Sequence, residues 1–115
     1  MRLVVKVGTS LIAPGGRIDT TRMRALVDQL DLSRHEYLIV SSGAIASGMA
    51  HLGLRQRPST VPLMQACAAV GQSLLMHTYE QLFSARKWSP SYCFPMTTSL
   101  PPCVIPIYRM RFMNC

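Results

Sequence analysis

At 115 residues with 49% hydrophobic side chains, the chain is long enough for one domain with a packed core, and no apolar run approaches the roughly 20 residues of a membrane-spanning helix. Its four cysteines form no C-x-x-C pair and its three histidines stand apart, which argues against a zinc site and a disulfide framework. The net charge of +7 is uneven, because residues 86–115 carry four basic and no acidic side chains, so we interpret it as a basic tail and expect no nucleic-acid or membrane partner.

The first predicted element is a strand at residues 3–7, which is continuously apolar apart from Lys6 and therefore suits a strand buried on both faces of a parallel sheet. Because Lys6 interrupts its apolar stretch, the N-terminus does not resemble a signal peptide, and we expect a cytoplasmic location. Gly8 ends the strand. Helix caps follow at residues 19–21, and apolar residues at i, i+3, i+4 and i+7 then predict an amphipathic helix: Met23, Leu26, Val27 and Leu30.

A second short strand is predicted at residues 37–40, and two apolar strands joined through a helix form a parallel β-α-β unit. This strand runs into the turn Ser41-Ser42-Gly43 and then into a helix over residues 44–52, which Gly53 closes at the usual position past its end.

A polar loop leads from there to a long helix over residues 63–85, with Thr60 as its cap and Pro62 in its first turn. Apolar spacing predicts its inner face, while Tyr79 and Phe83 are interpreted as packing residues; the predicted inner face is Leu63, Cys67, Val70, Leu74 and Leu82.

The pattern breaks from Trp88 onward, where five of the eight prolines and three of the four cysteines are found. The apolar run at residues 103–108 suits a strand only at a sheet edge, because Pro106 cannot donate to a ladder. The third strand expected after the long helix is therefore missing. We predict a division into residues 1–85, which form part of an α/β domain, and residues 86–115, a divergent Pro/Cys-rich basic tail without regular structure.

Two turns at strand ends are candidates for chemistry. Lys6, Gly8 and Thr9 lie at the carboxyl end of the first strand, which lines the ligand crevice in open α/β sheets. The G-x-x-x-x-G-K-S/T phosphate loop is absent, and the spacing alone supports a bound phosphate and a structural ion pair for Lys6 about equally. Ser42, Gly43 and Ala44 begin a helix, whose N-terminus favours carboxylate or phosphate, although the segment taken alone is better explained by an ordinary serine cap with glycines that allow close helix packing.

The wording and order of three segments carry more information than any one of them. V-V-K-V-G-T-S-L at residues 4–11, V-S-S-G-A-I-A-S-G at 40–48 and Q-A-C-A-A-V-G-Q-S-L-L at 65–75 closely resemble the amino-acid kinase family, and within it the branch that phosphorylates L-glutamate. The resemblance runs over residues 3–85. Kinases of acetylglutamate, aspartate and uridylate share the fold but not these strings.

The resemblance implies an α/β fold, an incomplete three-layer αβα sandwich with mainly parallel strands, and transfer of the ATP γ-phosphoryl group to the γ-carboxylate of L-glutamate toward proline. Matched by motif, Lys6 would be the catalytic lysine that contacts ATP, with Gly8 and Thr9 beside the phosphates. Ser42, Gly43 and Ala44 would hold glutamate. Mg²⁺ would arrive with ATP, no resident metal or tightly bound cofactor is implied, and a homo-oligomer is left open.

The family's later aspartate, asparagine and second lysine have no matching position in this sequence. We therefore expect either a kinase or a truncated, non-catalytic remnant that is inert or docks on an intact subunit. A shift of reading frame followed by an early stop is our hypothesis for the tail. Because two strands leave a sheet edge exposed, we also expect poor solubility or partial unfolding.

Overall fold

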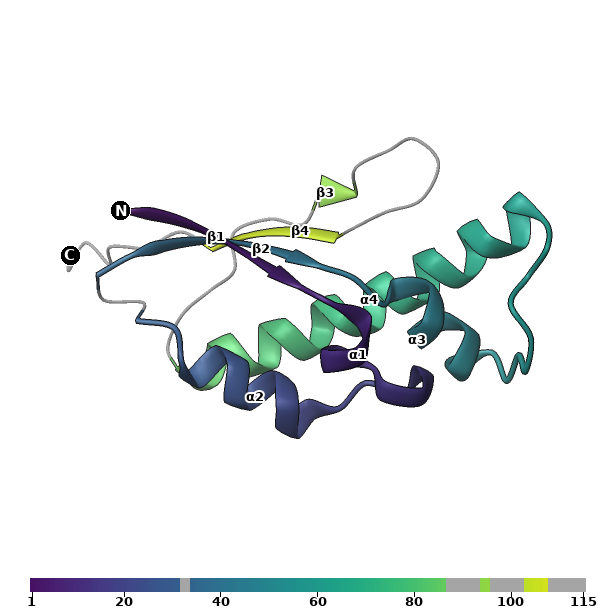
Figure 1. The fold of residues 1–115 in the computed structure, drawn as a ribbon, viewed down its shortest axis with the longest axis horizontal. Coiled ribbons are helices and arrows are strands. Elements are labelled where there is room, and N and C mark those ends of the chain that lie inside the picture. Colours follow the sequence, from purple (N-terminus) through teal and green to yellow (C-terminus); the bar gives the residue numbers. More distant parts are fainter. Residues whose placement is uncertain (32–33, 87–93, 96–102, 108–115) are drawn as a thin grey trace.

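The computed structural model describes residues 1–31, 34–86, 94–95 and 103–107. Figure 1 follows the chain through its helices and strands. In order they are β1 (Arg2–Val7), α1 (Thr9–Ile12), the 3-10 turn η1 (Pro14–Gly16), α2 (Thr20–Asp28), β2 (Glu36–Ser41), α3 (Ala44–His51), α4 (Val61–Ala85), β3 (Phe94–Pro95) and β4 (Cys103–Ile107).

The strands form one sheet in the order β1-β2-β4-β3. β1 and β2 pair in parallel, with Lys6 opposite Val40 and Val7 opposite Ser41, which confirms the predicted β-α-β unit. β4 pairs antiparallel to β2, and β3 pairs antiparallel to β4. The chain is therefore α/β as predicted, with its parallel pair at the N-terminal edge of the sheet.

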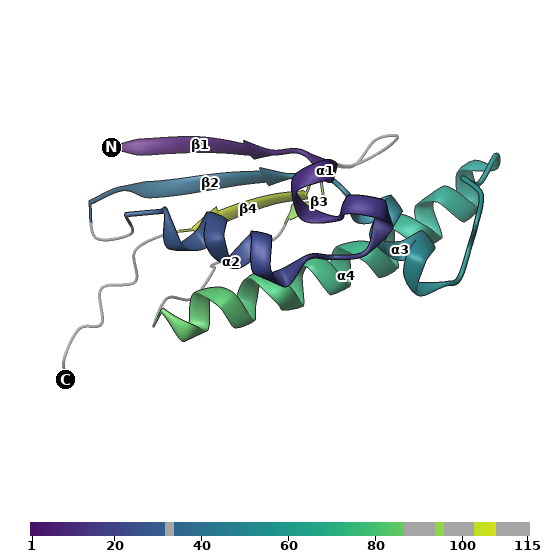
Figure 2. The ribbon, with the colours of Figure 1, turned by 60° about the horizontal axis from the view of Figure 1, so that its bottom comes forward.

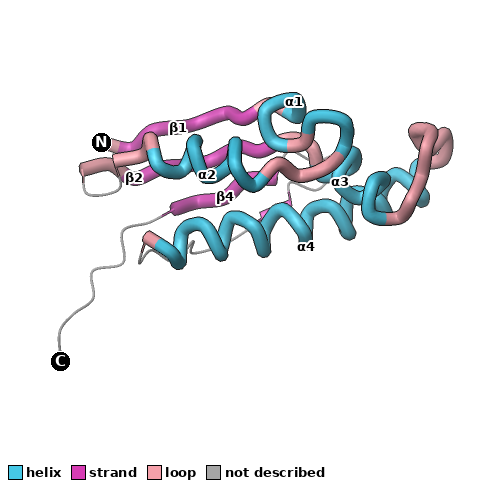
Figure 3. The backbone as a smooth tube through the Cα atoms, turned by 90° about the horizontal axis from the view of Figure 1, so that it is seen from below, coloured by secondary structure: helices cyan, strands magenta, loops and turns pink. Residues whose placement is uncertain are grey.

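The described helices lie on one face of the sheet, as Figures 2 and 3 show from two directions. α2 and α4 run beneath the strands, and α3 packs closely against the N-terminal half of α4. The described part of the chain thus contains two layers of a sandwich, a sheet and one layer of helices. No helix in this part is both long and apolar enough to span a membrane.

The prediction that β1 is buried on both faces is wrong. Leu3 and Val5 are partly buried and Val7 is fully buried against the helices, whereas the residues between them, among them Val4 and Lys6, are exposed. Because side chains alternate along a strand, Val4 and Lys6 lie on the face without helices. A continuous apolar run does not distinguish a strand covered on both faces from one covered on a single face.

The prediction that no third strand follows the long helix is also wrong. β4 occupies residues 103–107 beside β2, with Pro106 opposite Leu38. β3 pairs only with residues 103 and 104 of β4, so Pro106 lies where β4 has no neighbour on its other side among the described residues. A proline without an N–H group fits such a position, which is the edge character that its sequence predicts.

The remaining predicted elements are confirmed with small shifts at their ends. The Asp19 carboxylate caps α2 by accepting from the N–H groups of Thr21 and Arg22, at 3.0 and 3.1 Å. Gly53 follows α3 with a left-handed φ of 72°. The four-residue helix α1, directly after β1, was not predicted because its length is too short for apolar periodicity.

The inner face of α4 is only partly as predicted. Cys67 and Leu82 are buried, but Leu63 is 43% exposed and lies on the outside. The side that faces the sheet and α3 combines large and small residues: Cys67, Ala68, Gly71, Leu75, Tyr79, Leu82 and Phe83. The small ones are there because α3 approaches so closely that a methyl group added at Gly71 would lie 1.6 Å from the Ala44 carbonyl oxygen.

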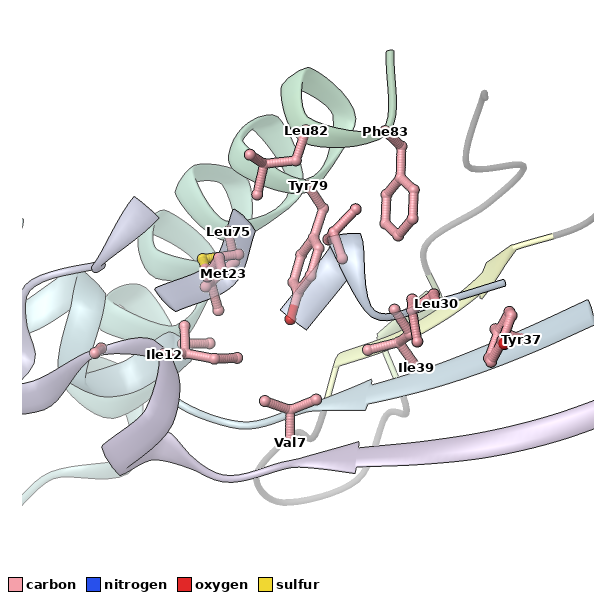
Figure 4. Packing of buried hydrophobic residues seen from close by; sticks show 13 residues of the cluster. Val7, Ile12, Met23, Leu30, Tyr37, Ile39, Leu75, Tyr79, Leu82 and Phe83 are labelled. Carbon is pink, nitrogen blue, oxygen red and sulfur yellow. The ribbon is translucent and has the colours of Figure 1, made fainter. Parts of the chain in front are cut away.

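The core lies between the sheet and the helices. Figure 4 shows side chains of α4 pointing toward Val7 of β1 and Ile39 of β2, with Ile12 and Met23 closing one side. Tyr79 is fully buried and its hydroxyl donates to Ser41 Oγ at 3.3 Å. This contact fixes the end of β2, where the chain turns into α3.

Candidate amino-acid and phosphate site

The carboxyl ends of β1 and β2 meet at one edge of the sheet, and each strand turns there into a helix. The Ser42 N–H donates to the Val7 carbonyl at 3.0 Å, so the two turns are joined directly after the last strand pair. A methyl group added at Gly43 would lie 3.5 Å from Thr9 Cγ2, which is ordinary contact distance. The turn after β1 and the turn after β2 are therefore packed against each other, as the parallel pairing predicts.

Gly43 gives α3 a start without a side-chain cap. Its φ of 97° is left-handed, and the N-cap position makes no side-chain cap hydrogen bond. The Ser47 N–H donates to the Gly43 carbonyl at 2.9 Å, which leaves the N–H groups of Ala44, Ile45 and Ala46 without an intrahelical acceptor. Such a helix start carries a partial positive charge and favours an anion.

A cavity of about 450 Å³ lies over this helix start. Four of the six predicted site residues line it, namely Thr9, Ser42, Gly43 and Ala44. The other lining residues are Ile45, Ala46, Met49 and Arg57. The described lining thus comes from the start of α1, the turn between β2 and α3, α3 as far as Met49 and one residue of the loop after α3, and it includes no carboxylate.

Lys6 and Gly8 do not line this cavity. Lys6 precedes Val7 on β1, and its exposed side chain points to the sheet face opposite the helices. Gly8 is the exposed residue that precedes α1, with an extended φ of −79°. Because the Lys6 side chain is exposed, burial does not force its ammonium group to pair with an anion.

Sequence reasoning missed Arg57, the one charged side chain among the described residues that line the cavity. Arg57 lies in the polar loop after α3. Its distance from Ser42 along the chain gives no signal that the two residues are close in space. A signal for Met49 existed, because Ile45 and Met49 are four residues apart on α3 and therefore share a face.

A second cavity, of about 380 Å³, lies on another side of α3 between η1 and α4. Arg17 and His51 are its titratable lining residues. None of the six predicted site residues is among the described residues that line it.

Comparisons with known proteins place the chain among kinases. Residues 1–105 match the model of the amino acid kinase family. Glutamate 5-kinase of Moorella thermoacetica is 50% identical over 88 residues, and glutamate 5-kinase of Dehalococcoides mccartyi is 54% identical over 87 residues. Glutamate 5-kinase 2 of Bacillus subtilis is 45% identical over 94 residues.

These alignments cover 72%, 72% and 78% of this chain, but only 23%, 23% and 25% of the relatives. The chain therefore spans about a quarter of the length of the curated relatives it matches. The family match extends past residue 85, and the division of the chain at that residue stays a prediction.

Proposed function

Because the chain belongs to the amino acid kinase family, we propose that it serves the ATP-dependent phosphorylation of the L-glutamate γ-carboxylate to glutamyl 5-phosphate, the first step toward proline, in the cytoplasm. The observation that carries the proposal is the cavity over the uncapped start of α3, lined by Thr9 from one turn and Ser42, Gly43 and Ala44 from the other. The names of the relatives support L-glutamate as the acid.

In this proposal the turn after β2 holds the amino acid. The free N–H groups at the start of α3 donate to a carboxylate, and the Ser42 hydroxyl is a side-chain donor in the same turn. The left-handed φ of 97° at position 43 favours glycine over residues that have a side chain. Because glycine has no side chain, the substrate can approach the backbone there. Glutamate would then lie with its reacting carboxylate toward Thr9.

The turn after β1 serves the phosphates of ATP. Gly8 and Thr9 offer backbone N–H groups there, and Lys6 is a flexible cation two residues before Gly8. Phosphoryl transfer requires mainly positioning and neutralisation of charge on the equatorial oxygens, which a lysine supplies as a point charge. In this proposal the Lys6 side chain reaches the phosphates from the outer face of the sheet, around the edge that β1 forms as the first strand in the sheet order.

Mg²⁺ enters this reaction as part of the nucleotide substrate. Hard cations of this kind prefer carboxylate and phosphate oxygens, and no carboxylate lines the cavity among the described residues. We therefore assign Mg²⁺ to the ATP phosphates and to no side chain of this part of the chain. Adenine and ribose are likewise assigned to none of the described residues.

The test combines binding with turnover on the purified 115-residue chain. Equilibrium binding of L-glutamate is measured by isothermal titration, and acyl phosphate is trapped as a hydroxamate in the presence of ATP, Mg²⁺ and hydroxylamine. We expect saturable glutamate binding and hydroxamate that requires both substrates. Lys6→Ala should lower turnover by at least about 100-fold while leaving glutamate affinity within about twofold.

Arg2→Ala is the matched control, because Arg2 is a cation on the same strand and the same sheet face but at the far end of β1. It should leave turnover unchanged. Glutamate binding without hydroxamate would favour the second reading, a non-catalytic remnant of the same fold. A chain that binds no L-glutamate would overturn the proposal.

A further inference from the structure

The loop between α3 and α4 brings one cation to the cavity. Among the described residues that line it, Arg57 is the only charged one. The ion pairs in the described residues join Arg2 to Glu36, Arg22 to Asp19 and Arg34 to Asp31, and Arg57 takes part in none of them. A guanidinium at a largely apolar cavity, with no carboxylate among the described lining residues, is available to an anion from outside.

The backbone is held at one point before Arg57 and at one point after it. The Leu54 N–H donates to the Met49 carbonyl at 2.9 Å, which holds the start of the loop on the end of α3. Pro58, directly after Arg57, is buried, and its ring restricts the backbone there. A held backbone lowers the entropy that the side chain must lose when it orders on a ligand.

Arg57 and Thr9 approach the cavity from opposite ends of α3. Thr9 contacts Gly43 at the helix start, while the loop that carries Arg57 follows the helix end (Figure 1). Met49, which also lines the cavity, is five residues after Ala44, or about 7.5 Å of helix rise. The described lining of the cavity therefore runs along α3, from Thr9 near the helix start to Arg57 in the loop that follows the helix end.

We propose that Arg57 binds the α-carboxylate of the amino-acid substrate, the carboxylate that is not phosphorylated. The inference rests on the proposed function. A dicarboxylic acid in this cavity has one carboxylate at the start of α3 near Thr9 and a second that needs its own counter-charge. Arg57 supplies this charge through a planar fork that matches a carboxylate in two hydrogen bonds. This contact positions the substrate and lets Arg57 select dicarboxylic over monocarboxylic amino acids.

The test compares two ligands on four proteins. L-glutamate and 4-aminobutyrate share the γ-carboxylate and the amino group, but only glutamate has the α-carboxylate. Binding of each is measured by amide NMR on the full chain as purified, in the unchanged protein, Arg57→Gln, Arg57→Lys and Arg55→Gln. Arg55 is the matched control, because it is an exposed arginine of the same loop that does not line the cavity.

Arg57→Gln should weaken glutamate binding about 10- to 100-fold, the usual range for a charged hydrogen-bond pair, and leave 4-aminobutyrate binding within about twofold. Arg57→Lys should recover part of the loss, and Arg55→Gln should change neither ligand. An equal loss for both ligands, or no loss of glutamate binding in Arg57→Gln, would overturn the role of Arg57 while glutamate binding by the unchanged chain still supported the proposed function. Failure of the unchanged chain to bind glutamate would overturn both.

Discussion

Gly43 is the residue on which the shape of the site depends most directly. It joins β2 to α3 with a φ of 97°, and its Cα faces Thr9 across the junction of the two turns. A side chain at this φ is strained by roughly 1–2 kcal/mol because its Cβ crowds the following carbonyl. Gly43 is therefore needed for the left-handed backbone conformation, and its lack of a side chain leaves the start of α3 open to a ligand.

Gly43→Ala should lower the free energy of unfolding by about 1–2 kcal/mol and weaken L-glutamate binding, because the helix start must rotate to relieve the strain. Chemical denaturation followed by circular dichroism measures the first effect and titration the second. Gly8→Ala is the control for stability, since its φ of −79° suits any residue and an added Cβ would meet nothing within 4 Å. An unchanged midpoint for Gly43→Ala would show that the turn has a different conformation.

At the scale of elements, α3 is placed by its contact with α4. A methyl group added at Gly48 would lie 1.7 Å from the Cys67 carbonyl oxygen, and one added at Gly71 would lie 1.6 Å from the Ala44 carbonyl oxygen. Both partners are backbone atoms, which cannot move as a side chain can. The two helices therefore cross at glycines, and the position of Ala44 in the site follows from this crossing.

Gly71→Ala should destabilise the fold by about 2–3 kcal/mol or more, because overpacking against backbone forces α3 away from α4. Since Ala44 begins α3, the same change should weaken glutamate binding. Ala66→Ser is the control, because this exposed position of the same helix should tolerate an added atom within about 0.5 kcal/mol. Thermal denaturation of both variants separates the outcomes, and equal melting temperatures would contradict the close crossing.

The end of α4 is tied to the end of α2 by Arg86. Its guanidinium donates to the Val27 carbonyl in the last turn of α2 and, at 3.1 Å, to the Leu30 carbonyl just past the end of α2. Arg86→Gln should cost about 1–3 kcal/mol of stability through loss of these charged hydrogen bonds.

Arg34→Gln is the comparison for this variant. The Arg34 side chain is 79% exposed and its ion pair with Asp31 is 3.6 Å long, so its loss should cost less than about 0.5 kcal/mol. Urea denaturation of the two variants measures the difference. Equal stabilities would mean that Arg86 does not cap α2 in solution, and would favour a domain that ends at residue 85.

Sequence reasoning succeeded for elements whose signal is local. The cap at Asp19 with its apolar spacing predicted α2, and Gly53 predicted the end of α3. It failed where neighbours decide. The inner face of α4 includes the small residues Ala68 and Gly71, whose burial depends on the approach of α3. Apolar spacing alone favours Leu63 for this face, but Leu63 is exposed.

The site was predictable to the extent that it follows from parallel strands. Strand ends that share an edge predict that Thr9 and Ser42 lie together, and they line one cavity. The position of Lys6 on the outer face could not be inferred, because an apolar run does not reveal which faces are covered. Arg57 could not be inferred either, since the return of its loop to α3 is a property of the tertiary fold.

At the scale of the whole molecule, the sheet has one face without helices in the described residues. Val4 on this face is 66% exposed, and β1 is the edge strand of the sheet order. An apolar strand at an open edge is a site for pairing with another chain. We therefore expect concentration-dependent association of the purified protein through β1.

Val4→Lys should raise solubility and reduce the apparent mass in light scattering, because a charge on an edge strand opposes pairing. Ala25→Lys adds the same charge at an exposed position of α2 and should leave association unchanged. Monomeric unchanged protein with a sharp cooperative melt would contradict this expectation and the solubility prediction made from the sequence.

The central claim is that the two joined turns at the ends of β1 and β2 bind the amino-acid substrate. Amide NMR of the full chain during an L-glutamate titration tests it most directly. We expect the largest saturable chemical-shift changes at the N–H groups of Ala44, Ile45 and Ala46, with a smaller change at Thr9. Shifts concentrated around the second cavity at Arg17 and His51, or no saturable shift in the first turn of α3, would contradict it.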